Sequence, residues 1–142
     1  MTPMKRLRRA TRLAAPVVVA AVFVTVPASA AEKAYTGGVR EQPKAAVEFK
    51  LVRDGGEFVK PFRVQHIRLS CELGPDHIVI TRLRFGQIPV VDDRFHKKRH
   101  PSDVAAAVSG QLVRHGRAHG RLRITEDAAF CDSGILHWHA HT

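Results

Sequence analysis

The chain has 142 residues, a length typical of a single domain. It carries 23 Lys and Arg against 13 Asp and Glu, so its formal net charge is +10. Such a balance favours acidic polymers as partners, but charge alone does not select nucleic acid.

The first 30 residues have the organisation of a signal peptide. Five basic residues and no acid occur in residues 1–12, an apolar run follows from Leu13 to Val26, and Pro27-Ala28-Ser29-Ala30 supplies the small residues of a cleavage site. We therefore expect cleavage after Ala30 and a secreted, periplasmic or cell-envelope protein. The apolar run is shorter than the roughly 20 residues of a membrane span, so no span is expected after cleavage. An uncleaved N-terminal anchor is the alternative.

The remaining residues, 31–142, are expected to form one secreted domain. They contain 18 Lys and Arg against 13 Asp and Glu, so the net charge of this part is +5. Both cysteines, Cys71 and Cys131, lie here. Thiols of an oxidising compartment most often pair, which predicts one disulfide. A metal site that uses both thiolates is the alternative, although the chain has no CxxC spacing.

The first part of this domain shows strand patterns separated by turns. Ala45–Val52 alternates apolar and charged side chains, which predicts a half-buried strand. Asp54-Gly55-Gly56 is a turn sequence. In Glu57–Cys71 the apolar side chains change from even to odd positions, which a flat strand cannot accommodate. We therefore expect a bulge or break near Gln65-His66.

The middle part is expected to contain one long strand and an exposed loop. In His77–Phe85, one face would carry Val79, Thr81, Leu83 and Phe85 and the other would carry Ile78 and Ile80. Six of the eight residues from His96 to Asp103 are charged or histidine, and Pro101 breaks strand pairing. This segment is therefore predicted to be a loop.

The last third alternates again, with apolar side chains inward and basic ones outward. Val104–Leu112 predicts a strand, although Ala105-Ala106-Ala107 leaves a helix as the alternative. Ala118–Ile124 and Leu136–Ala140 predict two further strands. With the earlier segments this gives about eight or nine short strands and no helical stripe. The predicted fold is an all-β, antiparallel β-sandwich or partly closed barrel.

A set of short motifs follows the chain in a fixed order. They are Tyr35-x-Gly37, Cys71, Ile88-Pro89-Val90, Phe95, Gly110-x-Leu112, Ala118-x-Gly120-x-Leu122-x-Ile124, Cys131-x-Ser133-Gly134 and Trp138-x-Ala140. This order resembles that of small secreted bacterial proteins of unknown function, over nearly the whole of residues 31–142. The resemblance implies a single extracytoplasmic all-β domain with one disulfide, and it transfers no catalytic residues.

The closing segment has three histidines at alternate positions: His137, His139 and His141. On a strand these share one face at a spacing of about 7 Å, which suits coordination of zinc or copper with a further ligand such as His119 or His66. No other cofactor is indicated. The alternative is that Trp138 and Ala140 belong to the core while the histidines are solvated at a chain end.

The densest basic cluster is Lys97-Lys98-Arg99. It predicts contact with an anionic polymer of the cell envelope. The aromatic side chains fall mostly at core positions, which argues against a role in nucleic-acid binding, because single-strand binders stack bases on exposed rings. The alternative is a charged surface that only keeps the protein soluble.

One short motif is similar to the surroundings of a chymotrypsin-like nucleophile: Asp132-Ser133-Gly134. Its flanking glycines are missing and 112 residues are too few for two barrels, so we expect no enzyme. The sequence predicts a non-catalytic secreted module that binds an anionic polymer or serves as a structural surface. An extracytoplasmic zinc- or copper-binding protein is the alternative.

Overall fold

The computed structural model describes residues 31–142, so the predicted signal peptide and its cleavage site lie outside the described residues. Residues 31–142 contain no helix that is long and apolar enough to cross a membrane. The strands are β1 (Ala31–Val39), β2 (Gln42–Arg53), β3 (Glu57–Val59), β4 (Phe62–Cys71), β5 (His77–Phe85), β6 (Ile88–Pro89), β7 (Arg94–Arg99), β8 (Val104–Val113), β9 (Arg117–Glu126), β10 (Cys131–Asp132) and β11 (Leu136–His141).

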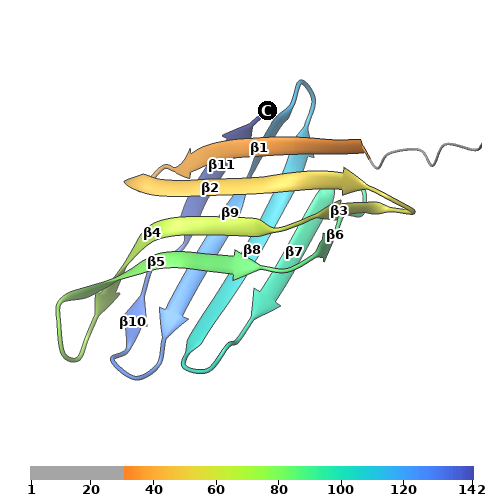
Figure 1. Cartoon of the computed structure of the whole chain (residues 1–142). Helices are drawn as coiled ribbons and strands as arrows, with labels where there is room; N and C mark the ends of the chain where they lie inside the picture. The colour runs from red at the N-terminus through yellow and green to blue at the C-terminus, as the bar shows by residue number, and fades with distance from the viewer. Residues whose placement is uncertain (1–30) are drawn as a thin grey trace, which may run out of the picture.

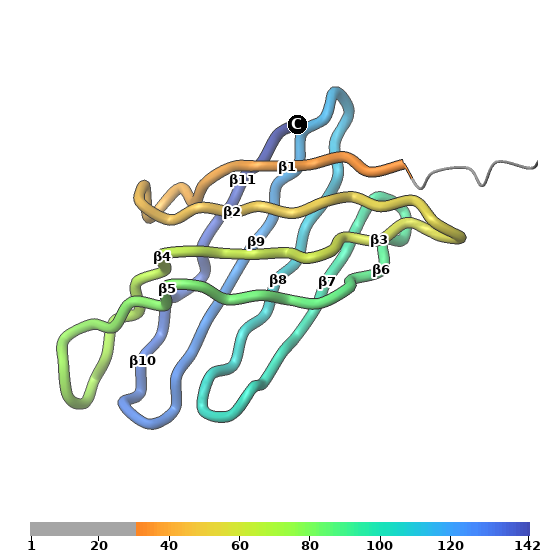
Figure 2. The backbone as a smooth tube through the Cα atoms, viewed as in Figure 1, coloured from red at the N-terminus to blue at the C-terminus, as the bar shows by residue number. Residues whose placement is uncertain are grey.

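The strands form two layers, each built from one half of the described chain. In Figure 1, β1, β2, β4 and β5 lie side by side in one layer, and β7, β8, β9 and β11 run behind them at a steep angle. The tube in Figure 2 shows the chain passing from the first layer to the second after β6. The two layers therefore face each other across one shared core.

Six of the strands close into a ring. Each neighbour in the order β4–β10–β9–β11–β1–β2 is hydrogen-bonded to the next, and β2 pairs with β4. Beyond this ring, β5 extends from β4, β8 and β7 extend from β9, and β3 and β6 extend from β2. The predicted all-β fold of the sandwich or partly closed barrel type is confirmed.

Aromatic side chains fill the space between the layers. Phe49, Phe62, Phe95 and Trp138 pack with ring centroids 5.2–6.0 Å apart. The Trp138 indole is buried, and its Nε1 donates to the Ser109 carbonyl at 3.2 Å. The core thus joins residues from both halves of the chain.

Two glycines make room for the indole. Gly110 on β8 and Gly120 on β9 are directly paired, and a Cβ on either would lie 2.6–2.7 Å from Cζ2 of Trp138. Such contacts are too short for real side chains. The Gly110-x-Leu112 and Gly120-x-Leu122 motifs therefore reflect close packing of the two strands against one large ring.

Several inward positions agree with the sequence prediction. Val47, Phe49 and Leu51 are buried on β2, and Leu136, Trp138 and Ala140 are buried on β11. The segment beginning at Val104 is strand β8, so the helix alternative is wrong.

The predicted break in β4 occurs at His66. This residue has a φ of 57°, in the left-handed region, and the buried side chains change from Phe62 and Val64 to Ile67 and Leu69 across it. The side chains that point to the core are therefore at even positions before His66 and at odd positions after it.

The face predicted for the first half of β5 is wrong. Val79 is 48% exposed and Thr81 is exposed, whereas Ile78 and Ile80 pack against the core. The reason is pairing: Ile80 lies opposite Ile67 and Ile78 lies opposite Leu69. Paired residues of antiparallel strands share a face, so β5 changes its phase where β4 does.

The loop predicted for His96–Asp103 is also wrong over its first part. Arg94–Arg99 forms β7, which pairs with β8. Only Phe95 of this strand is buried, so the alternation that marks a strand is absent from the sequence. β7 is an edge strand, and charged side chains on an edge oppose pairing with other chains.

Candidate functional site

Positive charge is concentrated in one stretch of the chain. Residues 94–123 contain eight Lys and Arg and a single acid, Asp103, whereas the rest of residues 31–142 contains ten Lys and Arg against twelve acids. The whole excess of +5 therefore comes from the segment that forms β7, β8 and β9.

Strand pairing brings four of these eight bases, Arg94, Lys98, Arg121 and Arg123, onto the outer surface of the second layer. Lys98 lies opposite Ala107, which lies opposite Arg123. One step along the strands, a row crosses all four: His96, Ser109, Arg121 and His137. We call this surface the basic face and define it by Arg94, His96, Lys98, His119, Arg121, Arg123, His137 and His139, whose side chains alternate with buried ones on the same strands.

A groove runs along the middle of the basic face. β8 contributes the short side chains of Ala105, Ala107 and Ser109 to most of this surface, between longer side chains of β7 and β9, and Gln111 follows between Arg94 and His119. Two shallow hollows of about 440 and 220 Å³ meet here and share Lys98, Ala107 and Arg123 in their walls. The groove therefore has a small-residue floor and cationic walls.

Acidic side chains neutralise only part of this face. Arg123 forms a two-point ion pair with Asp132, with Nε to Oδ1 at 3.1 Å and Nη2 to Oδ2 at 2.5 Å. This bond lowers the pKa of Asp132 and raises that of Arg123. Within residues 31–142, Lys98 and Arg121 form no ion pair. Their charges remain available to a ligand.

The predicted cluster Lys97-Lys98-Arg99 is divided between two sides of β7. Lys98 belongs to the basic face, whereas Lys97 and Arg99 alternate with it and lie opposite the buried residues Val108 and Ala106 of β8. The Arg99 guanidinium donates to the carbonyl of Arg84 on β5. The structure therefore does not bring the three residues together on one surface. Lys98 instead shares the basic face with Arg121.

The three closing histidines share the outer side of β11. His137 is tied to Glu41, which lies in the turn between β1 and β2, with Nδ1 to Oε1 at 2.6 Å. His139 is paired with His119, and His141 with Arg117. Within residues 31–142 no three His, Cys, Asp or Glu side chains come close enough together to hold a metal ion. Zinc or copper binding by His137, His139 and His141 stays a prediction.

The cysteines join the two layers. Cys71 at the end of β4 is bonded to Cys131 on β10, with an S–S distance of 2.04 Å. The same two residues are directly paired across the strands. The crosslink thus lies at one of the two places where the ring of strands closes.

Ser133 has a structural role in the adjoining turn. Its hydroxyl accepts from the Ile124 backbone N–H at 2.9 Å and donates to the Gly134 carbonyl at 2.8 Å. Asp132 accepts from the Gly134 N–H while it binds Arg123. Turn geometry accounts for the Asp-Ser-Gly motif.

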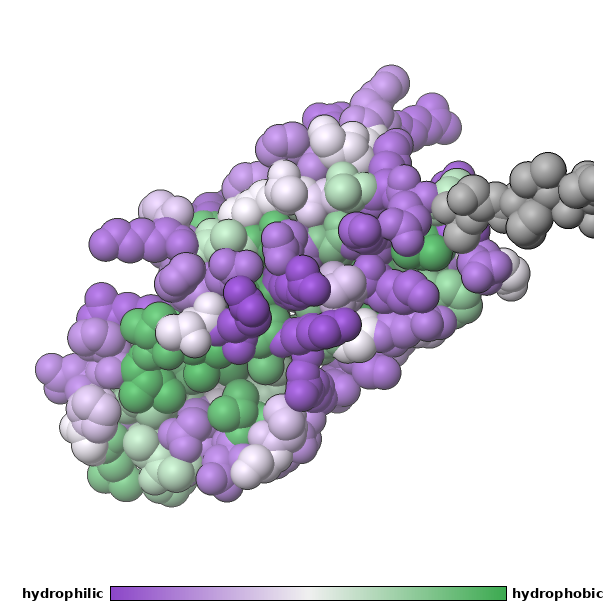
Figure 3. All heavy atoms as spheres, viewed as in Figure 1, coloured by the Kyte–Doolittle hydropathy of each residue, from purple (hydrophilic) through white to green (hydrophobic). Residues whose placement is uncertain are grey.

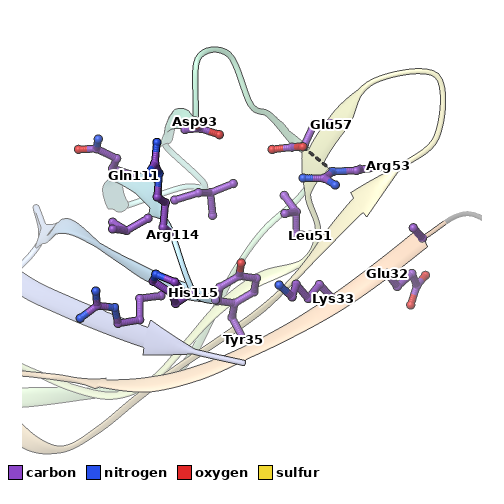
Figure 4. A pocket seen from close by; sticks show the side chains of 15 residues that line it. Glu32, Lys33, Tyr35, Leu51, Arg53, Glu57, Asp93, Gln111, Arg114 and His115 are labelled. Carbon is purple, nitrogen blue, oxygen red and sulfur yellow. Dashed lines mark hydrogen bonds and ion pairs between the residues drawn. The ribbon is translucent and has the colours of Figure 1, made fainter.

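A second site, not predicted from the sequence, opens at one end of the sandwich between the two layers. We call it the mouth cleft. It has a volume of about 940 Å³, and its walls include Lys33, Tyr35, Leu51, Leu112, Arg114 and Arg117. Figure 4 shows the Tyr35 hydroxyl directed into the space between Leu51 and Arg114. The available signal was the basic turn that holds Arg114 and Arg117, but its nearness to Tyr35 depends on the fold.

The outer surface of the first layer is different in character. In Figure 3 hydrophilic side chains surround a hydrophobic area over β5 and the strand ends beside it. Val79 on β5 and Phe130 before β10 are exposed in this part of the molecule. This surface lacks the uniform charge of the basic face, because some of its bases are paired with acids, as in Arg63 with Glu48 and Lys50 with Glu32.

Comparison with known proteins returned no matching family model, no matching curated protein and no matching solved structure. The function of this protein is therefore inferred from the chemistry of its own sites.

Proposed function

We propose that the protein is a secreted, non-catalytic binding module that holds an anionic polymer against its basic face. The observation that carries the proposal is the placement of four bases, Arg94, Lys98, Arg121 and Arg123, on the outer surface of β7 and β9, within the segment that carries the whole positive excess. An extended face without deep enclosure suits a chain-like ligand better than a small molecule.

The spacing of the cations supports a polymeric ligand. Side chains on one face of a strand repeat at about 7 Å, and neighbouring strands lie about 4.8 Å apart. His96 and Lys98 on β7 and Arg121 and Arg123 on β9 therefore form two rows along the groove of β8. A polymer with a regularly repeated phosphate or carboxylate group meets several of these cations at once.

The chemistry of the face favours an envelope polymer over nucleic acid. Its residues are Arg, Lys and His, with Ala and Ser in the groove. Single-stranded nucleic acids are usually held by stacking of bases on exposed aromatic rings, and Phe95 and Trp138 of these strands are buried. The proposal requires recognition of repeated charge only.

The test measures binding of polyphosphate to the protein at several salt concentrations. The variant Lys98→Ala/Arg121→Ala removes two cations of the groove, and the control Lys44→Ala/Arg82→Ala removes two exposed cations of the other layer. We expect wild-type affinity to fall with salt and the slope of log K against log salt to decrease by about 1 for each groove cation removed. Equal slopes for both double variants would refute the basic face as the site.

A further inference from the structure

The mouth cleft carries an inference that does not depend on polymer binding. Its floor is the phenol of Tyr35, whose ring stacks on Phe49 with centroids 4.7 Å apart and planes at 6°. Phe49 belongs to the aromatic core, so the ring is held firmly. Within residues 31–142 the hydroxyl has no hydrogen-bond partner, and it points into the cleft (Figure 4).

The hydroxyl is a donor at neutral pH. Burial raises the pKa of Tyr35 above its ordinary value of 10.0, the nearby Arg53 lowers it, and Glu57 raises it. The phenol therefore keeps its proton. Because the hydroxyl is reachable from the cleft, it can donate to an acceptor atom of a ligand that enters there.

The charges around the cleft favour an anion. Glu57 is bound by Arg53 at 2.7 Å, and Glu32 is bound by Lys50 at 3.0 Å. Among the cleft residues that form no ion pair within the described chain, three are cations, Lys33, Arg114 and Arg117, and one is an acid, Asp93.

The walls of the cleft are also partly apolar. Leu51 comes from the first layer, and Leu112 and Val113 come from the second. The turn that carries Arg114 is held in place by a hydrogen bond, in which the Thr142 N–H donates to the Gly116 carbonyl at 2.9 Å. Small-molecule sites typically combine such apolar walls with a few directed polar groups.

We propose that the mouth cleft binds a small organic acid with an apolar body. Its carboxylate accepts from the Tyr35 hydroxyl and from the guanidinium of Arg114, and its body lies between Leu51 and Leu112. Arg117 and Lys33 add positive charge at the entrance. No covalent step is involved.

Three probes of related shape separate charge from apolar contact. Benzoate has both features, benzamide has the same ring without the charge, and acetate has the charge without the ring. We expect benzoate to bind the protein measurably in calorimetry, and benzamide and acetate to bind at least about tenfold more weakly, because each lacks one of the two contacts. Equal binding of benzoate and benzamide would overturn the proposal.

Variants then locate the site. Tyr35→Phe removes the hydroxyl and keeps the stacked ring, and Arg114→Gln changes an exposed turn residue, so neither disturbs the core. Each should weaken benzoate binding about tenfold, since each removes a hydrogen bond to a charged group. The basic-face variant Lys98→Ala/Arg121→Ala should leave it unchanged. Unchanged affinity in both cleft variants, or loss in the basic-face variant, would refute the cleft as the site.

An optical measurement provides an independent check. Tyr35 is the only tyrosine of the chain, so the absorbance of its phenolate reports this group alone. A carboxylate bound to the hydroxyl disfavours the phenolate and should move the alkaline titration of Tyr35 to higher pH. Benzamide should not move it. An identical titration with and without benzoate would contradict contact between ligand and hydroxyl.

Discussion

At the scale of single residues, the packing of Trp138 explains why two strands carry glycine. A Cβ at Gly120 would lie 1.9 Å from the Ser109 carbonyl oxygen and 2.7 Å from the indole. Neither group has room to move, because Ser109 is in the β8–β9 ladder and Trp138 is surrounded by Phe49, Phe62 and Phe95. The indole can occupy its position because Gly120 has no side chain.

The substitution Gly120→Ala is therefore expected to destabilise the fold. Forcing one extra methyl into a close-packed core costs about 1–3 kcal/mol, and a clash with backbone falls at the upper end of that range. The free energy of unfolding can be measured by denaturant titration with the fluorescence of Trp138, the only tryptophan of the chain.

The matched control is Gly38→Ala. A Cβ at Gly38 would meet only the Ala45 carbonyl oxygen at 3.5 Å, an ordinary contact. This variant should change the free energy of unfolding by no more than about 0.5 kcal/mol. If both variants cost the same, the glycines do not serve to seat the indole.

At the scale of elements, Glu41 joins β11 to the turn between β1 and β2. Its carboxylate accepts from the His137 backbone N–H at 2.8 Å and from the His137 imidazole at 2.6 Å. These bonds, the backbone one first, lower the pKa of Glu41 from 4.5 to about 2. The last strand is thereby fastened beside the first.

This contact predicts a pH-dependent stability. The folded-state pKa is the lower one, so the ionised carboxylate stabilises the fold above pH 4.5, and this contribution is lost as the pH falls from about 4.5 to about 2. Glu41→Gln should therefore be less stable than wild type at pH 7, and the difference should diminish toward pH 2. Thermal unfolding at pH 7, 4 and 2 measures it.

Glu72→Gln makes the same change of charge at an exposed carboxyl without an ion pair in residues 31–142. It should follow the wild-type profile. A difference between Glu41→Gln and wild type that is constant over the whole pH range would show that shape, rather than charge, matters at this position.

Elements also show where sequence patterns are sufficient. Strands with one buried and one solvated face, such as β2, β9 and β11, were predicted with the correct residues inward, because alternation records that environment. β7 has only one buried side chain, so its sequence shows no alternation of apolar and polar residues. Which side chains of β5 point inward depends on its pairing with β4, and the sequence of β5 alone does not identify that partner.

The candidate sites show the same division. The outward direction of Arg121, Arg123 and His137 follows from local alternation, whereas Lys98 was identified only as part of a basic cluster in a predicted loop. Their assembly into one face depends on the register of four strands, which joins residues 41 positions apart in the case of His96 and His137. The mouth cleft requires β1 and β2 to meet the turn between β8 and β9, and a pattern within one segment cannot reveal that contact.

At the scale of the whole molecule, the charge is divided between the layers. Residues 94–123, which form β7, β8 and most of β9, carry a net +7, from eight bases and one acid, and the rest of residues 31–142 carries −2, from ten bases and twelve acids. A molecule with such a separation is oriented by an anionic surface, which attracts one layer and not the other. The same orientation leaves the mouth cleft, at the end of the sandwich, open to small solutes.

The proposal as a whole requires that the protein leaves the cytoplasm. Ala28 and Ala30 are the small residues expected before the predicted signal cleavage site, and Ala31 opens the first strand. We expect the exported protein to begin at Ala31 and to have an intact mass lower by two hydrogens than the sum of residues 31–142, because Cys71 and Cys131 are bonded. Mass spectrometry of the secreted or periplasmic fraction tests both points at once. A chain that retains Met1 and sediments with membranes would favour the uncleaved anchor instead. A cytoplasmic chain with both thiols reduced would refute the proposal, because the basic face could then not meet an envelope polymer.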